Sequence, residues 1–170
     1  LLVTWVGHHT RKEPKVLMSE YTIRDATPED LLDIVIAAKN FSKEASEKSW
    51  AKFDSNKVSV LFGQLIESEY GFVHMALHDD EVVGGLVAVI SEMPINSYLV
   101  AQELMLWIDP DHRNGKTAPK MIEEYVNWAR EKGCRFVRLS EIDSVLNGKA
   151  GILFKRKGFD PVETAYVKEL

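Results

Sequence analysis

The chain has 170 residues, of which 45% are hydrophobic and 28% are charged, and this composition excludes a disordered, collagen-like or low-complexity protein. The formal net charge of −5 argues against a general nucleic-acid binder, and the single cysteine, Cys134, excludes an intrachain disulfide and a cysteine-based zinc site. The longest apolar runs are far shorter than the roughly 20 residues that span a bilayer. We therefore expect a cytoplasmic protein with no membrane and no nucleic-acid partner.

The N-terminal segment differs from the rest of the chain. A short apolar stretch precedes a basic one, which is the reverse of the order in a secretory signal. Met18 begins a segment that is typical of a cytosolic N-terminus. We expect residues 1–17 to be a mobile tail or a gene-start artefact, and residues 18–170 to form one domain. His8 and His9 are adjacent, and adjacent side chains rarely bind one ion, so we predict no metal site.

The remaining chain alternates between patterns typical of strands and of helices. A threonine cap followed by proline and two acidic residues, Thr27–Asp30, marks the start of the first helix. In chain order we expect a strand at 21–24, helices from 28 and at 58–66, strands at 70–78, 82–90 and 100–108, a helix at 118–132, a strand at 135–140, a helix at 147–157, and closing strands at 159–162 and 165–168. This order predicts an α/β fold (a mixed α+β sheet) that contains one β-α-β unit.

The loop after the strand at 100–108 is the segment most indicative of a ligand. It is basic and rich in small residues, and it leads into a helix N-terminus, where unpaired backbone N–H groups and the helix dipole favour phosphate. Gly115-Lys116-Thr117 is similar to the end of a P-loop, but Pro110 stands where that motif needs glycine, so a P-loop is excluded. The dinucleotide fingerprint G-x-G-x-x-G is absent as well. An ordinary loop with incidental basic residues stays open at this point.

Three segments, in the same order, resemble the GCN5-related N-acetyltransferase (GNAT) family. Arg113-Asn114-Gly115-Lys116-Thr117-Ala118 resembles the family's acyl-CoA pyrophosphate loop, [QR]-x-x-G-x-[GA], although Lys116 stands where the loop usually has glycine. Asn147–Phe159 resembles the family segment N-x-x-A-x-x-x-Y-x-x-x-G-F, and Tyr21–Asp30 resembles its opening strand and helix cap. The likeness covers residues 21–170. It implies the acyl-CoA N-acyltransferase fold, with a mostly antiparallel twisted sheet and helices on both faces.

The resemblance implies an enzyme that transfers the acetyl group of acetyl-CoA to a primary amine, by direct attack in a ternary complex. Glu103 would act as the base that deprotonates the amine, and strand alternation places it on the same face as Met105 and Trp107. A glutamate that points to solvent is the open alternative. The residues implied to bind coenzyme A are Leu106 and Ile108 through their main chains, the loop residues Arg113, Asn114, Gly115, Lys116, Thr117 and Ala118, and Asn147 and Phe154. Asn147 is also suited to a helix N-cap.

One departure from the family pattern bears on catalysis. Phe154 stands where the family commonly has the tyrosine that protonates the departing thiolate. Phenylalanine cannot donate a proton, so the thiolate leaves unassisted, with the help of water, or with the help of another residue such as Tyr166. This keeps open a non-catalytic acyl-CoA-binding module or sensor, and a nucleotide-binding regulatory domain as a further alternative.

The acceptor is less constrained by the sequence. Ser140, Glu141 and Asp143 follow the strand at 135–140 and are candidates for lining the acceptor site. His74 and His78 lie four apart on one strand and share a face, but we expect them to be ordinary polar-face residues. We expect the acceptor to be a small-molecule or peptide amine. The resemblance also suggests a homodimer.

Overall fold

The computed structural model describes residues 20–45, 52–142 and 148–170. The tail at 1–17, with His8 and His9, lies outside these residues, and so do Asp143 and Asn147. The elements in chain order are β1 (Tyr21–Asp25), η1 (Pro28–Asp30), α1 (Leu31–Ala45), α2 (Ser55–Glu67), β2 (Gly71–His78), β3 (Glu81–Glu92), β4 (Leu99–Ile108), η3 (Pro110–His112), α3 (Thr117–Glu131), β5 (Phe136–Arg138) and α4 (Lys149–Arg156).

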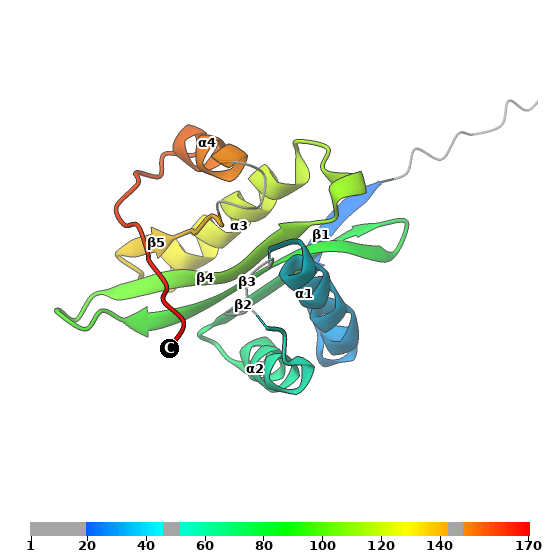
Figure 1. Cartoon of the computed structure of the whole chain (residues 1–170), viewed down its shortest axis with the longest axis horizontal. Helices are drawn as coiled ribbons and strands as arrows, with labels where there is room; N and C mark the ends of the chain where they lie inside the picture. Colours follow the sequence, from blue (N-terminus) through cyan, green and yellow to red (C-terminus); the bar gives the residue numbers. More distant parts are fainter. Residues whose placement is uncertain (1–19, 46–51, 143–147) are drawn as a thin grey trace, which may run out of the picture.

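The strands form one sheet in the order β1-β2-β3-β4-β5 (Figure 1). The first three pairings are antiparallel, and β5 pairs with β4 in parallel through the crossover helix α3. The predicted α/β fold with a mixed, mostly antiparallel sheet and one β-α-β unit is therefore confirmed.

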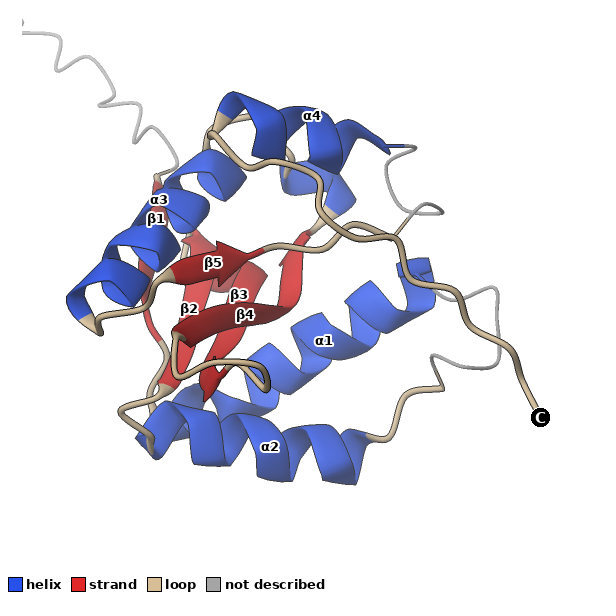
Figure 2. Ribbon diagram, turned by 90° about the vertical axis from the view of Figure 1, so that its left-hand side faces the viewer, coloured by secondary structure: helices blue, strands red, loops and turns tan. Residues whose placement is uncertain are grey.

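Helices cover both faces of the sheet, as predicted. Figure 2 shows α3 and α4 on one side and α1 and α2 on the other. On the α3 side, buried residues such as Leu86, Tyr125 and Phe154 form one core cluster. On the α1 side, Ile34 and Met105 belong to a second cluster. The sheet thus separates two apolar cores, and any ligand that reaches both sides must pass its edge.

The first helical turn begins at Pro28 after the predicted cap Thr27, whereas α2 begins at Ser55, three residues before the predicted start. The carboxylate of Asp30 accepts hydrogen bonds from the Thr27 N–H at 2.8 Å and from the Arg24 guanidinium at 2.7 Å. The hydrogen bond from Arg24 is the main reason that the pKa of Asp30 lies well below its usual value. At α2, the Asp54 carboxylate accepts from two N–H groups of the first turn. These caps fix α1 and α2 against the sheet.

The two closing strands predicted at 159–162 and 165–168 are wrong. Described residues 159–170 form neither strand nor helix, and Tyr166 is 92% exposed. The segment is tied to β5 by an ion pair between Glu163 and Arg138. β-Prone residues need a partner strand, and β5, with three residues, offers only a short edge.

Candidate active site

A β-bulge in β4 determines where the site residues point. Val87 of β3 pairs with Met105, and the next residue, Ala88, pairs with Glu103, so Leu104 is the extra residue of the bulge. Residues directly opposite each other share a face, and Ala88 belongs to the α3-side core whereas Val87 and Met105 belong to the α1-side core. The prediction that Glu103 shares a face with Met105 and Trp107 is therefore wrong, because the bulge interrupts the alternation between them.

The sheet opens at the same place. β5 pairs only with Val100–Gln102, so β4 has no partner strand on that side from Glu103 onward. A cavity of about 900 Å³ lies at this opening, which is within the range of about 300–1,000 Å³ that is usual for small-molecule sites. It is lined by β4, by the loop and first turn of α3, by residues 140–142 and by α4, and on its other side by α1 and α2. The cavity therefore reaches both faces of the sheet.

Glu103 lies in the wall of this cavity, and its side chain is buried, so the alternative of a glutamate pointing to solvent is wrong. The backbone N–H of Ser140 donates to its Oε2 at 3.1 Å. Burial disfavours the charged carboxylate and raises the pKa of Glu103 to about 7, although the hydrogen bonds from Ser140 lower it in part. A carboxyl group with such a pKa exchanges protons near neutral pH, which suits a general base.

Tyr125 is a buried tyrosine of the α3-side core. Burial, with the charge of Glu103 as a smaller cause, raises the pKa of Tyr125 well above its usual value. Its hydroxyl group donates to the carbonyl of Arg138 at 3.2 Å, and Tyr125 does not line the cavity. The phenol is therefore a structural group that helps to hold β5 and not a proton donor facing the cavity.

Arg113, predicted to bind phosphate, is held by protein groups. Its guanidinium pairs with the carboxylate of Glu44 at 2.6 Å, and its Nε donates to the carbonyl of Ile108 at 2.9 Å. The indole Nε1 of Trp107 donates to the same Glu44 carboxylate at 2.8 Å. Arg113 still lines the cavity, but its charge is matched by Glu44, so its first role is to fix the end of β4 to α1.

The loop before α3 offers fewer free N–H groups than its sequence suggests. The side-chain oxygen of Asn114 accepts hydrogen bonds from the N–H groups of Lys116 at 2.8 Å and Thr117 at 3.0 Å. Within the described part of the chain, the N–H groups of Gly115 and Ala118 have no protein acceptor. Gly115, Thr117 and Ala118 line the cavity, whereas Asn114 and Lys116 do not. Asn114 is therefore occupied by N–H groups at the start of α3, whose N-cap residue is Lys116.

Comparisons with known proteins identify the family. A sequence model described as the acetyltransferase (GNAT) family matches residues 34–159. The chain belongs to this family. A search of curated proteins finds no match to the GNAT chain. None of its helices, over the described residues, is long and apolar enough to cross a bilayer.

Many solved structures share the fold of this GNAT protein. A protein described as a predicted acetyltransferase from Clostridium acetobutylicum, solved with acetyl-CoA, is 15% identical, with 88% of this chain and 96% of that chain covered and a TM-score of 0.72. The enzyme AAC(6')-Iy, in complex with a bisubstrate analogue, is 17% identical, with 89% and 99% covered and a TM-score of 0.72. A ribosomal-protein-alanine N-acetyltransferase from Brucella melitensis biovar Abortus 2308 is 14% identical, with 88% and 99% covered and a TM-score of 0.67. At these identities the likeness shows the fold alone.

The other predicted cofactor residues lie at the cavity. Leu106, Ile108 and Phe154 all line it, and Phe154 is also part of the α3-side core. Tyr166 does not line the cavity, so the structure gives no support to it as the acid. The roles of Leu106, Ile108 and Phe154 in binding coenzyme A stay predictions.

Sequence reasoning missed two basic residues of the cavity. Lys149 and Arg156, both on α4, line it. They are seven residues apart and therefore lie on the same face of the helix, and this spacing was the signal available in the sequence. Of the residues predicted for the acceptor site, Ser140 and Glu141 line the cavity, and the Glu141 carboxylate accepts from the N–H of Gly151 at 2.7 Å.

The predicted polar roles of His74 and His78 agree with their contacts. His74 lies between the carboxylates of Asp25 and Glu124, at 2.6 and 3.1 Å, and stacks on Phe72. The ring of His78 packs on the ring of Tyr21 with centroids 4.5 Å apart. Neither histidine lines the cavity. Among the described residues, no group of three or more His, Cys, Asp or Glu side chains could hold a metal ion.

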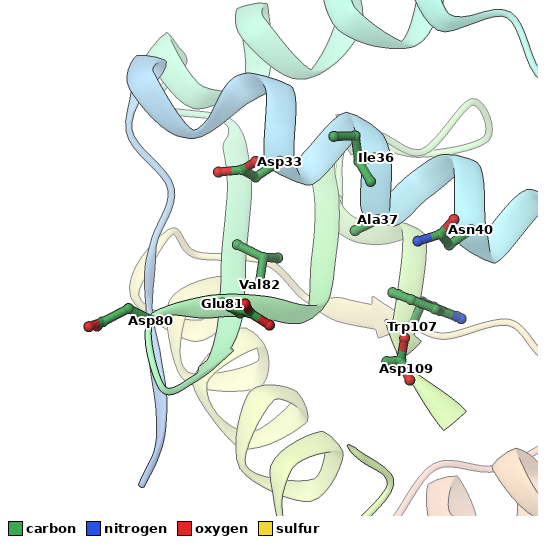
Figure 3. A pocket seen from close by; sticks show the side chains of 9 residues that line it. All are labelled: Asp33, Ile36, Ala37, Asn40, Asp80, Glu81, Val82, Trp107 and Asp109. Atoms are coloured by element: carbon green, nitrogen blue, oxygen red, sulfur yellow. The ribbon is translucent and has the colours of Figure 1, made fainter. Parts of the chain in front are cut away.

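A smaller hollow of about 320 Å³ lies on the other flank of α1 (Figure 3). It is acidic, since Asp33, Asp80, Glu81 and Asp109 line it. In Figure 3 the Asp80 carboxyl group points away from the other side chains. The only residue that lines both this hollow and the main cavity, within the described chain, is Trp107, so this hollow contains none of the predicted site residues.

Proposed function

We propose that this protein transfers the acetyl group of acetyl-CoA to a primary amine by direct attack in a ternary complex. The observation that carries the proposal is the buried Glu103, whose pKa is raised to about 7, in the wall of a cavity that opens where β4 separates from β5. The family supplies the reaction class, acetyl transfer. The cofactor, the amine acceptor and the order of events are the proposed parts.

The cavity has groups that suit coenzyme A. Beyond Gln102, the main chain of β4 has no partner strand on the β5 side, so its polar groups can pair with the amide groups of a pantetheine arm. The N–H groups of Gly115 and Ala118 are free to bind a diphosphate at the start of α3. Lys149 and Arg156 add positive charge to the wall of α4.

The chemistry that we assign to the chain centres on Glu103. An alkyl ammonium ion with a pKa near 10.4 is not a nucleophile, so Glu103 takes its proton, directly or through water, and holds it in the cavity. The thioester supplies an acetyl group with a thiolate leaving group. The amine nitrogen forms the C–N bond, the C–S bond breaks, and the nitrogen releases its second proton to water. Phe154 cannot protonate the thiolate, so we propose that it leaves unassisted as the anion, since a thiol with a pKa near 8.5 is a tolerable leaving group.

A second function is favoured by the same Phe154. Without the family's tyrosine, the chain could serve as a non-catalytic acyl-CoA-binding module. In that case coenzyme A binds as tightly as it would to an active transferase, but no amine is acetylated.

Two measurements separate these functions. Calorimetry compares coenzyme A with ADP, which lacks the pantetheine arm, and a thiol-release assay with acetyl-CoA is run over a panel of primary amines. The transferase predicts tighter binding of coenzyme A than of ADP, and thiol release that depends on the amine. Binding without turnover favours the module, equal binding of ADP favours a nucleotide-binding domain, and no binding of coenzyme A overturns both acyl-CoA functions.

A matched pair of α4 variants tests the position of the cofactor. Leu153 lines the cavity, whereas its neighbour Ile152 is 53% exposed and does not. We expect Leu153→Trp to weaken the binding of coenzyme A by at least about tenfold, because the larger side chain occupies the cavity. This change corresponds to a loss of about 1.4 kcal/mol in binding free energy. Ile152→Trp should change it less than about twofold. Equal effects of the two variants would contradict this position.

A further inference from the structure

The two sides of the cavity differ in charge. Besides Glu103, its charged lining residues are Arg113, Glu141, Lys149 and Arg156, which all belong to the loop before α3, to the segment after β5 or to α4. The side beneath α1 and α2, called here the acceptor side, is mostly apolar and has Ser42 as its polar described residue on the helices; its other described residues are Ala38, Phe41, Ala45, Phe53, Val58, Leu61, Phe62 and Trp107. No described residue of α1 or α2 that lines the cavity is charged.

A carboxylate next to the acceptor side, that of Glu44 on α1, is already neutralised. Glu44 of α1 pairs with the Arg113 guanidinium through both of its oxygens, at 2.7 and 2.6 Å, and also accepts from the Trp107 indole. The acidic hollow of Figure 3 lies on the opposite flank of α1, and its acidic residues are Asp33 of α1, Asp80 and Glu81 at the start of β3, and Asp109 after β4. Neither the Glu44 carboxylate nor the described acidic residues of this hollow therefore offer an unpaired negative charge to the acceptor side.

We infer that the acceptor is a small primary amine with one amino group on an uncharged, apolar carbon skeleton. This inference rests on the proposed function. The reacting ammonium group meets the carboxylate of Glu103 at the open edge of β4, where the cavity joins the two faces of the sheet. From there the skeleton extends to the aromatic and aliphatic side chains of the acceptor side. A second ammonium group of a polyamine or an aminoglycoside would be left there without a partner, and burying an unpaired charge is costly.

A matched pair of substrates tests the inference. Hexylamine and 1,6-diaminohexane have the same six-carbon chain and ordinary alkyl amino groups, and they differ only in the second ammonium group. We expect kcat/KM with acetyl-CoA to be at least about tenfold higher for hexylamine, per reacting amino group, in the thiol-release assay. We expect 2-phenylethylamine to have a kcat/KM similar to that of hexylamine, and spermidine to have a much lower one.

A matched pair of α2 variants shows whether the acceptor side sets this preference. Leu61 lines the cavity and is 40% exposed, whereas Val60 is 62% exposed and does not line it. A carboxylate at 61 can pair with the second ammonium group, so Leu61→Glu should lower the preference for hexylamine by about threefold to fivefold, as expected for a partly exposed ion pair. Val60→Glu adds the same charge outside the cavity and should leave the preference within about 1.5-fold.

The outcomes distinguish the two levels of the proposal. Turnover that favours 1,6-diaminohexane or spermidine overturns the substrate class and leaves the transferase in place. Equal shifts in Leu61→Glu and Val60→Glu would mean that the preference is set elsewhere, and would also overturn the assignment of the acceptor side. Failure of every amine, with coenzyme A still bound, overturns the proposed function and this inference together.

Discussion

Replacing Glu103 by glutamine tests the proposed base and the effect of its burial in one variant. The substitution keeps the shape of the side chain and removes its charge and its ability to take a proton. General-base catalysis contributes about 100-fold to 10,000-fold to a rate, so we expect kcat to fall by that factor. The affinity for coenzyme A should change little, because the cofactor is proposed to contact β4 through its main chain.

The raised pKa of Glu103 also predicts a stability effect. Its pKa lies near 7 in the folded protein, against an ordinary value of 4.5, a difference of about 3 kcal/mol at 1.36 kcal/mol per pKa unit. The folded state holds the proton more tightly than the unfolded state between these values, so the wild type loses stability as pH rises from about 4.5 to about 7. Glu103→Gln stays neutral and should lack this loss, which makes it relatively more stable at pH 8 than at pH 4.5, by up to about 3 kcal/mol.

The assays are urea unfolding at several pH values and thiol release between pH 5.5 and 9. The ratio of wild-type to variant kcat/KM cancels the titration of the amine itself, and it should rise with pH and level off above about 7, when Glu103 is charged. Glu92→Gln, at an exposed end of β3, is the control and should match the wild type. A Glu103→Gln enzyme with unchanged turnover, or a rate ratio that is flat with pH, would refute the role of Glu103 as base.

Three further variants and one control test the scaffold of the site by urea unfolding. Gly84→Ala should destabilise the protein by about 1–3 kcal/mol, because its Cβ would lie 2.6 Å from a backbone oxygen of β4. Gly63→Ala is the control: the nearest atom there is a side-chain carbon at 3.6 Å, so this variant should be neutral or stabilising by up to about 1 kcal/mol. Equal losses of stability in the two variants would contradict the packing around Gly84. Asn114→Ala removes the acceptor of two N–H groups at the start of α3 and should cost about 1 kcal/mol, so an unchanged stability would show that these hydrogen bonds do not stabilise the helix start. Glu44→Ala leaves the guanidinium of Arg113 without its partner and should cost about 1–3 kcal/mol; no loss would contradict the pairing.

The main elements of the fold were predictable because their apolar residues recur at the spacing of a helix or a strand, and because residues that begin or end such elements flank them. The helix predicted at 118–132 is α3 (Thr117–Glu131), and the strand predicted at 100–108 is β4 (Leu99–Ile108). The closing strands were not predictable in this way. Propensity alone indicated strands after Phe159, but whether a segment pairs depends on the length of the neighbouring edge, which only the folded sheet defines.

The location of the site in the chain was predictable from the sequence, but the contacts between its residues were not. The sequence located the loop before α3 and Glu103, both of which line one cavity. It could not show the bulge at Leu104, since residues 104–108 are all apolar and their sequence carries no hydrophobic pattern whose break would mark the extra residue. Nor could it show that Arg113 pairs with Glu44, a residue 69 positions away, because that contact depends on how α1 packs on the sheet.

A crystal structure with coenzyme A bound tests the central claim most directly. We predict density for the pantetheine arm along β4 from Glu103 onward, with the diphosphate at the N–H groups of Gly115 and Ala118 and the sulfur atom in the same cavity as the Glu103 carboxyl group. A cavity without ligand under saturating coenzyme A, or a cofactor bound elsewhere on the molecule, would contradict it.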